Sequence, residues 1–308
     1  MTEYSFTVNE NETGMTVESL IRSRMHIAGS RLRSLKFNHG LFLNGTNVHS
    51  NIKVKENDKI RVVFPDEKSK TKPFDLPLTV AFEDEHLIVI DKPAPLPTVS
   101  SCHKDENTLE NAVYSYLGCP EEFTYRPVNR LDRGTSGLLV AAKNPHCQYL
   151  LQQQLHTPGF VRKYLAVTDG CPAENEGIIS VPIASVPGSN KRAVSPEGKM
   201  CVTRYRVLMT ENAEESDRKI TPESGSFPES RSLIEFQLET GRTHQIRVHM
   251  AYLSCPVTGD YLYGTPCAEL PERFALHSYY LSFIHPVTGE KIEIKSDLPD
   301  ELRRLLGK

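Results

Sequence analysis

The sequence RPVNRLDRGTSGLLVAAKN, residues 126–144, decides how most of this chain is interpreted. It places the carboxylate of Asp132 between Arg130 and Arg133, and then passes through Gly134-Thr-Ser-Gly137 into the apolar segment 138–142. The apolar segment predicts a buried strand, and we expect the turn before it to hold Asp132 at the mouth of a sheet. Neighbouring guanidinium groups favour an ionised carboxylate, which suits a nucleophile better than a general acid. Taken alone, the stretch is better explained by an ordinary ion pair that braces a loop.

The composition is that of a globular protein. The chain has 308 residues, of which 38% are hydrophobic and 24% charged, so two domains are expected. No apolar stretch approaches the roughly 20 residues that span a bilayer, and residues 1–14 are acidic and polar, unlike a signal peptide. We therefore expect a soluble cytoplasmic protein without a membrane partner, and the sequence gives no sign of an obligatory protein partner.

The cysteines suggest neither disulfides nor zinc. There are seven, scattered along the chain and never spaced as Cys-x-x-Cys. We therefore interpret them as small buried or unreactive thiols.

The charge is unevenly distributed. The net charge of −3 favours no general attraction to nucleic acid, but residues 126–204 hold ten Lys/Arg against five Asp/Glu. Residues 21–36 form a second basic zone without acids, whereas residues 211–229 are acidic. The two zones indicate either a polyanion-binding surface or ordinary solvated faces.

The chain divides into two predicted domains. Residues 1–65 are expected to form a small unit with a helix around Leu20, a second helix over 30–37, a turn at Asn44-Gly45 and a closing strand over 59–64. Residues 66–75 are charged and polar and are interpreted as a linker. Residues 76–308 form the second domain.

The second domain mixes helices and strands too irregularly for a repeated βαβ pattern. A helix capped by Asn107, with Glu110 at the capping-box position, is predicted through residue 116, and another over 145–156 after Asn144-Pro145. The acidic segment 211–230 is expected to be an exposed loop. The fold class is therefore predicted as α+β with a mixed, largely antiparallel central sheet flanked by helices. The predicted strands are 78–82, 86–91, 138–142, 160–168, 233–238, 279–284 and 291–295.

A second group of chemical residues lies in GRTHQIRVHM, residues 241–250. Thr243 is the expected helix N-cap, and the N–H groups at this helix start, together with Arg242, predict an anion site. Arg247 lies one turn into the helix, where a guanidinium would hold a carboxylate bidentately. His244 and His249 are five residues apart, which does not match a metal-binding pair, and are most simply structural.

A third group lies in the predicted strand 160–168. Alternation places Tyr164 and Ala166 on one face and Lys163, Leu165 and Val167 on the other. Tyr164 is either a platform on which a base stacks or part of the core.

Together these segments resemble one known family. RLDRGTSGLL, residues 130–139, closely resembles the motif of the RluA-type pseudouridine synthases, and the similarity covers roughly residues 76–295. Residues 1–65 resemble, more weakly, an S4-like RNA-binding domain of α+β class. The other segments that match, in order, are Asp91-Lys92-Pro93 with Leu96-Pro97, then 163–167, 241–249 and 259–264, then Leu276-His277 and 285–289.

The resemblance implies the pseudouridine synthase fold and an enzyme that isomerises uridine in ribosomal or transfer RNA, without cofactor or metal. The target base would be flipped out of its stem. Asp132 would be the catalytic aspartate, attacking either the uracil ring or the sugar C1′. Tyr164 would stack on the base and help to move a proton, and Arg247 would keep Asp132 ionised and aimed. Arg130 would fill the space that the base leaves. The expected RNA-binding residues are Arg130, Arg133, Arg242 and His244, with Arg22, Arg31 and Arg33 in the first domain.

Two positions depart from the family pattern. Asn129 stands where a His is usual and Pro95 where a Gly is common, from which we expect altered RNA contacts or turn geometry rather than lost activity. One rival hypothesis, a catalytically silent RNA-binding or assembly factor, predicts the loss of Asp132, Tyr164 or Arg247. Another, a glycoside hydrolase, requires two carboxylates, and the motifs supply only Asp132.

Overall fold

The computed structural model describes residues 2–25, 29–37, 39–64, 71–100, 107–155, 157–212 and 230–307. Its contacts divide the chain into two compact units, residues 1–70 with 120–124 and residues 71–119 with 125–308. Residues 66–70 of the predicted linker 66–75 and residues 213–229 of the predicted loop 211–230 lie outside the described residues.

The first unit has two helices against a small antiparallel sheet. The strands lie in the order β1-β4-β2-β3. Both predicted helices, the closing strand and the turn are confirmed, and Asn44 and Gly45 have φ of 50° and 84°. The first strand was not predicted. The elements are β1 Thr2–Thr7, a 3₁₀ turn Glu10–Glu12, α1 Val17–Met25, α2 Gly29–Phe37, β2 Leu41–Leu43, β3 Thr46–Asn47 and β4 Lys59–Phe64.

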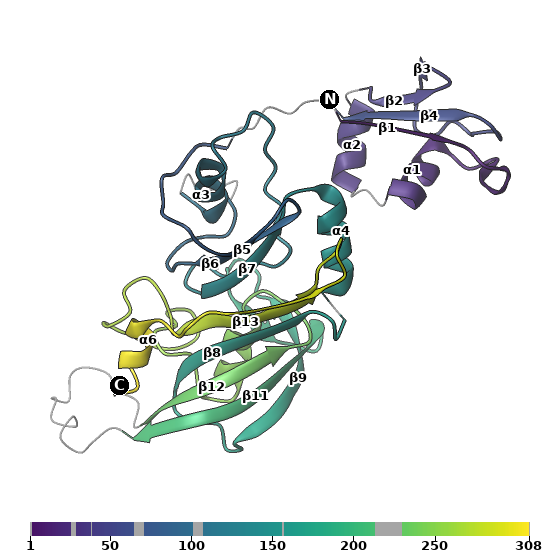
Figure 1. The fold of residues 1–308 in the computed structure, drawn as a ribbon. Coiled ribbons are helices and arrows are strands. Elements are labelled where there is room, and N and C mark those ends of the chain that lie inside the picture. Colours follow the sequence, from purple (N-terminus) through teal and green to yellow (C-terminus); the bar gives the residue numbers. More distant parts are fainter. Residues whose placement is uncertain are drawn as a thin grey trace. The chain divides into compact units, whose positions relative to one another are not determined.

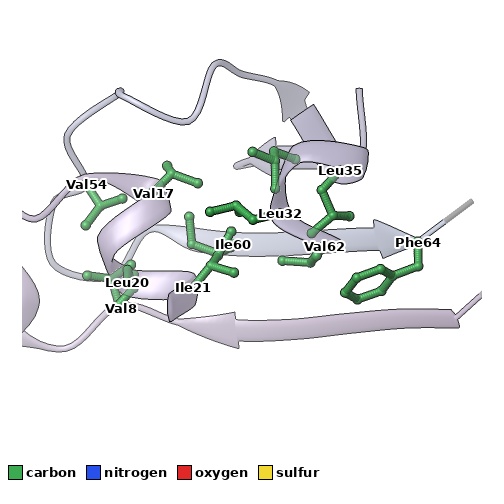
Figure 2. Packing of buried hydrophobic residues seen from close by; sticks show 11 residues of the cluster. Val8, Val17, Leu20, Ile21, Leu32, Leu35, Val54, Ile60, Val62 and Phe64 are labelled. Carbon is green, nitrogen blue, oxygen red and sulfur yellow. The ribbon is translucent and has the colours of Figure 1, made fainter. Parts of the chain in front are cut away.

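The core of the first unit follows from helical and strand spacing. Leu20 and Ile21 of α1 and Leu32 of α2 point toward β4, as Figure 2 shows. In β4 the buried positions alternate, so that Ile60 and Val62 face the helices. This apolar seam gives the unit a core of its own.

The second unit is built on one ten-stranded sheet. The strands lie in the order β10-β9-β11-β12-β8-β13-β7-β6-β5, with β14 paired to β13, and β13, β8, β12 and β11 lie side by side in Figure 1. Among these pairs β7 and β13 run parallel and the others antiparallel. The predicted α+β class with a mixed, largely antiparallel sheet is therefore confirmed. The strands are β5 Thr79–Glu83, β6 Leu87–Lys92, β7 Ser136–Ala142, β8 Val161–Asp169, β9 Glu176–Ser185, β10 Arg192–Val194, β11 Lys199–Asn212, β12 Ser230–Leu238, β13 Leu276–Ile284 and β14 Lys291–Lys295.

The helices of this unit are α3 Leu109–Tyr116, α4 Pro145–Gln154, α5 Gln245–Tyr252 and α6 Asp300–Arg304. The Asn144 cap of α4 is confirmed, since its side chain accepts the Cys147 N–H at 2.9 Å. The predicted cap of α3 is wrong by one residue: Thr108 is the N-cap, and Asn111 is its capping-box partner. No helix among the described residues is long and apolar enough to cross a membrane.

Strands β9, β10 and β11 were not predicted. Many of their side chains remain partly or fully exposed, and Pro182 stands within β9, so no clean apolar alternation marks them. β9 pairs with β10 and β11, which follow it in sequence, so the missing signal was the alternation and not the distance between partners.

Strand β7 contains the second glycine and the apolar run of the segment 126–144. All seven of its residues are buried, as the apolar run predicts. Gly137 belongs to the strand and not to the preceding turn, with φ of +104°. A Cβ on Gly137 would lie 2.3 Å from the Ser278 carbonyl oxygen of β13. Glycine therefore permits the close parallel approach of β7 and β13.

Candidate active site

A cavity of about 460 Å³ brings the separate sequence segments together. Its walls come from residues 97–99, 128–133 and 241–247, with side chains of β8 and β13. The predicted catalytic residues Asp132, Tyr164 and Arg247 all line it, as do the predicted RNA-binding residues Arg130, Arg133, Arg242 and His244. Arg22, Arg31 and Arg33 belong to the other unit.

Asp132 and Arg247 make the expected contact. Nη1 of Arg247 donates a hydrogen bond to Oδ2 of Asp132 at 3.0 Å. The Arg247 side chain is 2% exposed, whereas that of Asp132 is 28% exposed and faces the cavity. The pair therefore presents a carboxylate that a substrate can reach, backed by a buried cation.

The bidentate grip predicted for Arg247 is made with another carboxylate. Nε and Nη2 of Arg247 donate to Oδ2 and Oδ1 of Asp260 at 2.6 and 2.8 Å, and Asp260 is fully buried. Burial lowers the pKa of Arg247, but hydrogen bonding and charge from Asp260, followed by Asp132, outweigh it and raise that pKa. Asp260 thus offsets most of the cost of burying the guanidinium.

Aromatic rings enclose the same guanidinium. Cζ of Arg247 lies 4.1 Å from the centroid of the Phe274 ring and 5.1 Å from that of Tyr263. The Phe274 ring also packs closely on Gly134 of the segment 130–139, where a Cβ would lie 2.7 Å from the ring. The motif glycine therefore lets the Asp132 loop and Arg247 share one ring.

The start of α5 differs from the prediction. His244, not Thr243, is the N-cap, with φ of 60° and no capping hydrogen bond from its side chain. The backbone N–H of Arg242 donates to Oε1 of Gln245 at 2.9 Å, and the N–H of Gln245 donates to the Arg242 carbonyl at 3.1 Å. Two N–H groups of the predicted anion site are therefore already occupied, and the anion-site prediction is wrong for them.

His244 is oriented by a tyrosine. The Arg192 N–H donates to the Tyr263 hydroxyl oxygen at 2.7 Å, and that hydroxyl lies 2.8 Å from Nδ1 of His244. The hydroxyl has one proton to donate, and we infer that it donates this proton to Nδ1, which leaves the imidazole proton on Nε2. Nε2 lies 3.9 Å from Oδ2 of Asp132. Burial lowers the pKa of His244, as does the charge of Arg247 and Arg192, while Asp132 opposes them.

Tyr164 is both buried and part of the cavity wall. It is 5% exposed, on the buried face of β8 with Arg162 and Ala166, while Lys163 and Leu165 are more exposed, as the alternation predicts. Burial raises the pKa of the Tyr164 hydroxyl, so it stays protonated at neutral pH.

The exposed arginines of the cavity lining and Asn129, which departs from the family pattern, have different surroundings. Arg130, Arg133 and Arg242 are exposed, and Arg133 lies 4.0 Å from Glu272. Asn129 is buried, and its Oδ1 accepts the Val140 N–H at 3.0 Å, which ties the Asp132 loop to β7.

Three residues of the site were not assigned from the sequence. Asp260 and Tyr263 lie in GDYLYG, residues 259–264, which was quoted for the resemblance without a role. Arg162 stands two residues before Tyr164. The position of Asp260 in a matching motif was the available signal, but only folding shows which cation it binds.

Comparison with known proteins identifies one family. The family model for RNA pseudouridylate synthase matches residues 86–252. An uncharacterized RNA pseudouridine synthase of Bacillus subtilis (strain 168), YjbO, is 35% identical over 297 residues, which is 95% of this chain and 98% of that protein. The ribosomal large subunit pseudouridine synthase D of Vibrio cholerae is 32% identical over 322 residues, covering 97% and 93% of the two chains.

Solved structures share the fold. Human RNA Pseudouridylate Synthase Domain Containing 4 aligns with a TM-score of 0.54 and 25% identity over 73% of this chain and 92% of that one. Human RNA Pseudouridylate Synthase Domain Containing 1 aligns with a TM-score of 0.55 and 22% identity, covering 72% and 83%. With the matching family model and the relatives of nearly equal length, these findings show that the chain belongs to the RNA pseudouridylate synthase family, as its resemblance to the RluA type predicted.

Proposed function

We propose that this chain converts specific uridines of ribosomal or transfer RNA to pseudouridine, with Asp132 as the nucleophile. The observation that carries the proposal is the partly exposed carboxylate of Asp132 in the cavity wall, held by the buried Arg247 at 3.0 Å. Ribosomal RNA is the first candidate, because relatives such as the Vibrio cholerae protein are named for the large ribosomal subunit.

The proposed reaction is an isomerisation. Asp132 attacks either the uracil ring or the sugar C1′, the bond between N1 and C1′ breaks, and the base turns. A bond then forms between C5 and C1′, and the bond between Asp132 and the substrate breaks, which frees the carboxylate. C5 loses its proton and N1 gains one. No oxidant or second substrate is needed for this balance. Tyr164 would lie against the base and help to move the proton.

The size and charge of the cavity support a flipped nucleotide as the ligand. A volume of about 460 Å³ lies within the roughly 300–1,000 Å³ of sites that enclose small ligands. Its described lining carries five arginines and one aspartate, which favours a polyanion. Arg130, which is exposed and two residues before Asp132, would occupy the space that the base leaves.

The rival functions are less well supported. A catalytically silent RNA-binding or assembly factor would not need Asp132, Tyr164 and Arg247, yet all three are kept and gathered in one cavity. A glycoside hydrolase would need a second carboxylate across the bond, and Asp132 is the sole acid in the described lining.

The first unit would act as an S4-like RNA-binding domain over residues 1–65, joined by a linker over 66–75 to a catalytic domain over 76–308. Its basic run is partly neutralised: Arg22 pairs with Glu18 at 3.2 Å and Arg24 with Glu12 at 2.7 Å. Arg33 is exposed, and the side chain of Arg31 lies outside the described residues. We place the whole reaction in the cytoplasm.

Mapping pseudouridine in total RNA from cells with and without this gene tests the proposal. We expect one or a few sites, first in large-subunit ribosomal RNA, to lose pseudouridine when the gene is absent and to regain it when the purified protein is added. Identical maps, together with no conversion of unmodified RNA by the pure protein, would refute the function.

A further inference from the structure

Arg162 of β8 carries a buried guanidinium that makes no ion pair with any described carboxylate. The residue is 4% exposed. Its Nη2 donates a long hydrogen bond of 3.4 Å to the Leu155 carbonyl, and its buried Nε has no hydrogen-bond partner among the described residues. The positive charge is therefore buried with one weak acceptor and the Phe160 ring, whose centroid lies 6.0 Å from Cζ.

The other buried arginines of the described chain are different. Arg247 binds Asp260 and Asp132, and Arg273 forms an ion pair with Glu301. Burying a charge is costly unless an opposite charge and hydrogen bonds offset it. Arg162 departs from this rule, which indicates that its counter-charge comes from a ligand.

Arg162 lies where a ligand can reach it. It lines the same cavity as Asp132 and Tyr164. Its Nη1 packs against Gly241, where a Cβ would lie 2.9 Å from that nitrogen. The exposed Arg242 follows Gly241 and lines the cavity as well. Arg162 and Arg242 thus line the same cavity, and the residue next to Arg242 contacts the Arg162 guanidinium.

We propose that Arg162, with Arg242 beside it, binds a backbone phosphate next to the target uridine, an inference that rests on the proposed function. A phosphate supplies a full negative charge and several acceptor oxygens, which a guanidinium binds with two parallel hydrogen bonds. The uracil ring is neutral and offsets the buried charge less. Tyr164 lies two residues along the same face of β8, about 7 Å away. A phosphate held by Arg162 would therefore position the nucleotide whose base meets Tyr164.

The test uses the full-length protein and an RNA fragment that contains the mapped target uridine. The phosphate on its 5′ side, and separately that on its 3′ side, is replaced by an uncharged methylphosphonate. Dissociation constants and single-turnover rates are measured for the wild type and Arg162→Gln. The matched control is Arg206→Gln, since Arg206 is an exposed arginine of β11 paired with Glu235 that does not line the cavity.

We expect the wild type and Arg206→Gln to lose about 10- to 100-fold in affinity or rate with one of the two replacements. Arg162→Gln should show a similar loss on natural RNA. It should lose little more on the modified RNA, because the protein change and the RNA change remove the same interaction. If Arg162→Gln is instead as sensitive as the wild type to both replacements, the phosphate assignment is wrong.

A second variant tests the proposal if Arg162→Gln does not fold. Gly241→Ala keeps every charge but places a methyl group 2.9 Å from Nη1, so it should displace the guanidinium and reduce the sensitivity to the same replacement. Full sensitivity in Gly241→Ala would overturn the assignment. Conversion by the wild type would still support the proposed function in that case, whereas absence of conversion would count against the function itself.

Discussion

Arg247 is bound more completely by Asp260 than by Asp132. It donates two hydrogen bonds to Asp260, at 2.6 and 2.8 Å, and one to Asp132, at 3.0 Å. The buried carboxylate of Asp260 therefore makes most of the contacts that hold the guanidinium in place. Asp132 is bound through Oδ2 alone among the described contacts, which leaves Oδ1 available for attack on a substrate. We therefore infer that Asp260 is a positioning residue for Asp132, the proposed nucleophile.

Replacing Asp132 by Asn should abolish conversion while leaving the fold and RNA binding nearly unchanged. The amide has almost the same shape, but it is a poor nucleophile and carries no charge. Pseudouridine formation, RNA affinity and the denaturation midpoint are measured on the same preparation. Conversion at the wild-type rate in Asp132→Asn would show that another group is the nucleophile.

Replacing Asp260 by Asn should damage both stability and turnover. Breaking a buried ion pair costs about 3–5 kcal/mol, because a buried charge loses its partner. The freed guanidinium should then bind Asp132 more fully and withdraw its attacking oxygen, lowering the single-turnover rate at saturating RNA. Urea denaturation and single-turnover assays measure the two effects.

A matched control is available for this prediction. Asp300→Asn removes a carboxylate from an exposed pair with Arg303, where the Asp300 side chain is 75% exposed. Exposed pairs contribute about 0–1 kcal/mol, so this variant should be nearly neutral. Equal stability and rates in Asp260→Asn and Asp300→Asn would contradict the positioning role of Asp260.

Replacing Tyr263 by Phe should change the pH dependence of the reaction. The hydroxyl that we infer to donate to Nδ1 of His244 favours the neutral imidazole, whose pKa is already lowered by burial. Without that donor Nδ1 takes up a proton more easily, so the pKa of His244 should rise. As pH falls, His244 then becomes protonated at a higher pH in the variant than in the wild type.

The measurement is a profile of kcat/KM between about pH 5 and 8, around the ordinary histidine pKa of ~6.5. The acid limb should move to higher pH in Tyr263→Phe. Tyr261→Phe is the control, because Tyr261 lies nearby and is 51% exposed. Superimposable acid limbs in Tyr263→Phe and the wild type would rule out the inferred tautomer.

Deleting residues 1–65 should weaken RNA binding and flatten its dependence on salt. Each phosphate contact that is lost reduces the slope of log K against log salt by about 0.7–0.9. Affinity for the mapped RNA is measured at several salt concentrations for the full chain and the truncated one. A slope that stays the same would contradict the proposed S4-like domain.

Local pattern determined much of the fold. Apolar spacing predicted α1, α2, β7 and β8, and the Asn144-Pro145 pair predicted the start of α4. Such signals act over a few residues and survive in any context. The errors were also local: the cap of α3 is Thr108 rather than Asn107, because two adjacent residues were both able to cap. Strands β9 to β11 lacked alternation and became recognisable only through their partners.

Charge shows the limit of local pattern most clearly. Residues 21–36 contain no acid in sequence, yet Glu18 and Glu12 reach Arg22 and Arg24 from outside the run. A count along the chain therefore overstates the free positive charge.

The sequence by itself determined which residues are the candidates for the chemistry: Asp132, Tyr164 and Arg247 were singled out by motif and order, and all three line one cavity. Tertiary structure decided how they are held. Asp260 takes the bidentate bond of Arg247, Tyr263 orients His244, and Arg162 is left with a charge to offset. The physical reason is that a buried charge is costly unless it is paired with an opposite charge. Both the burial and the pairing arise only when segments distant in sequence come together in the fold.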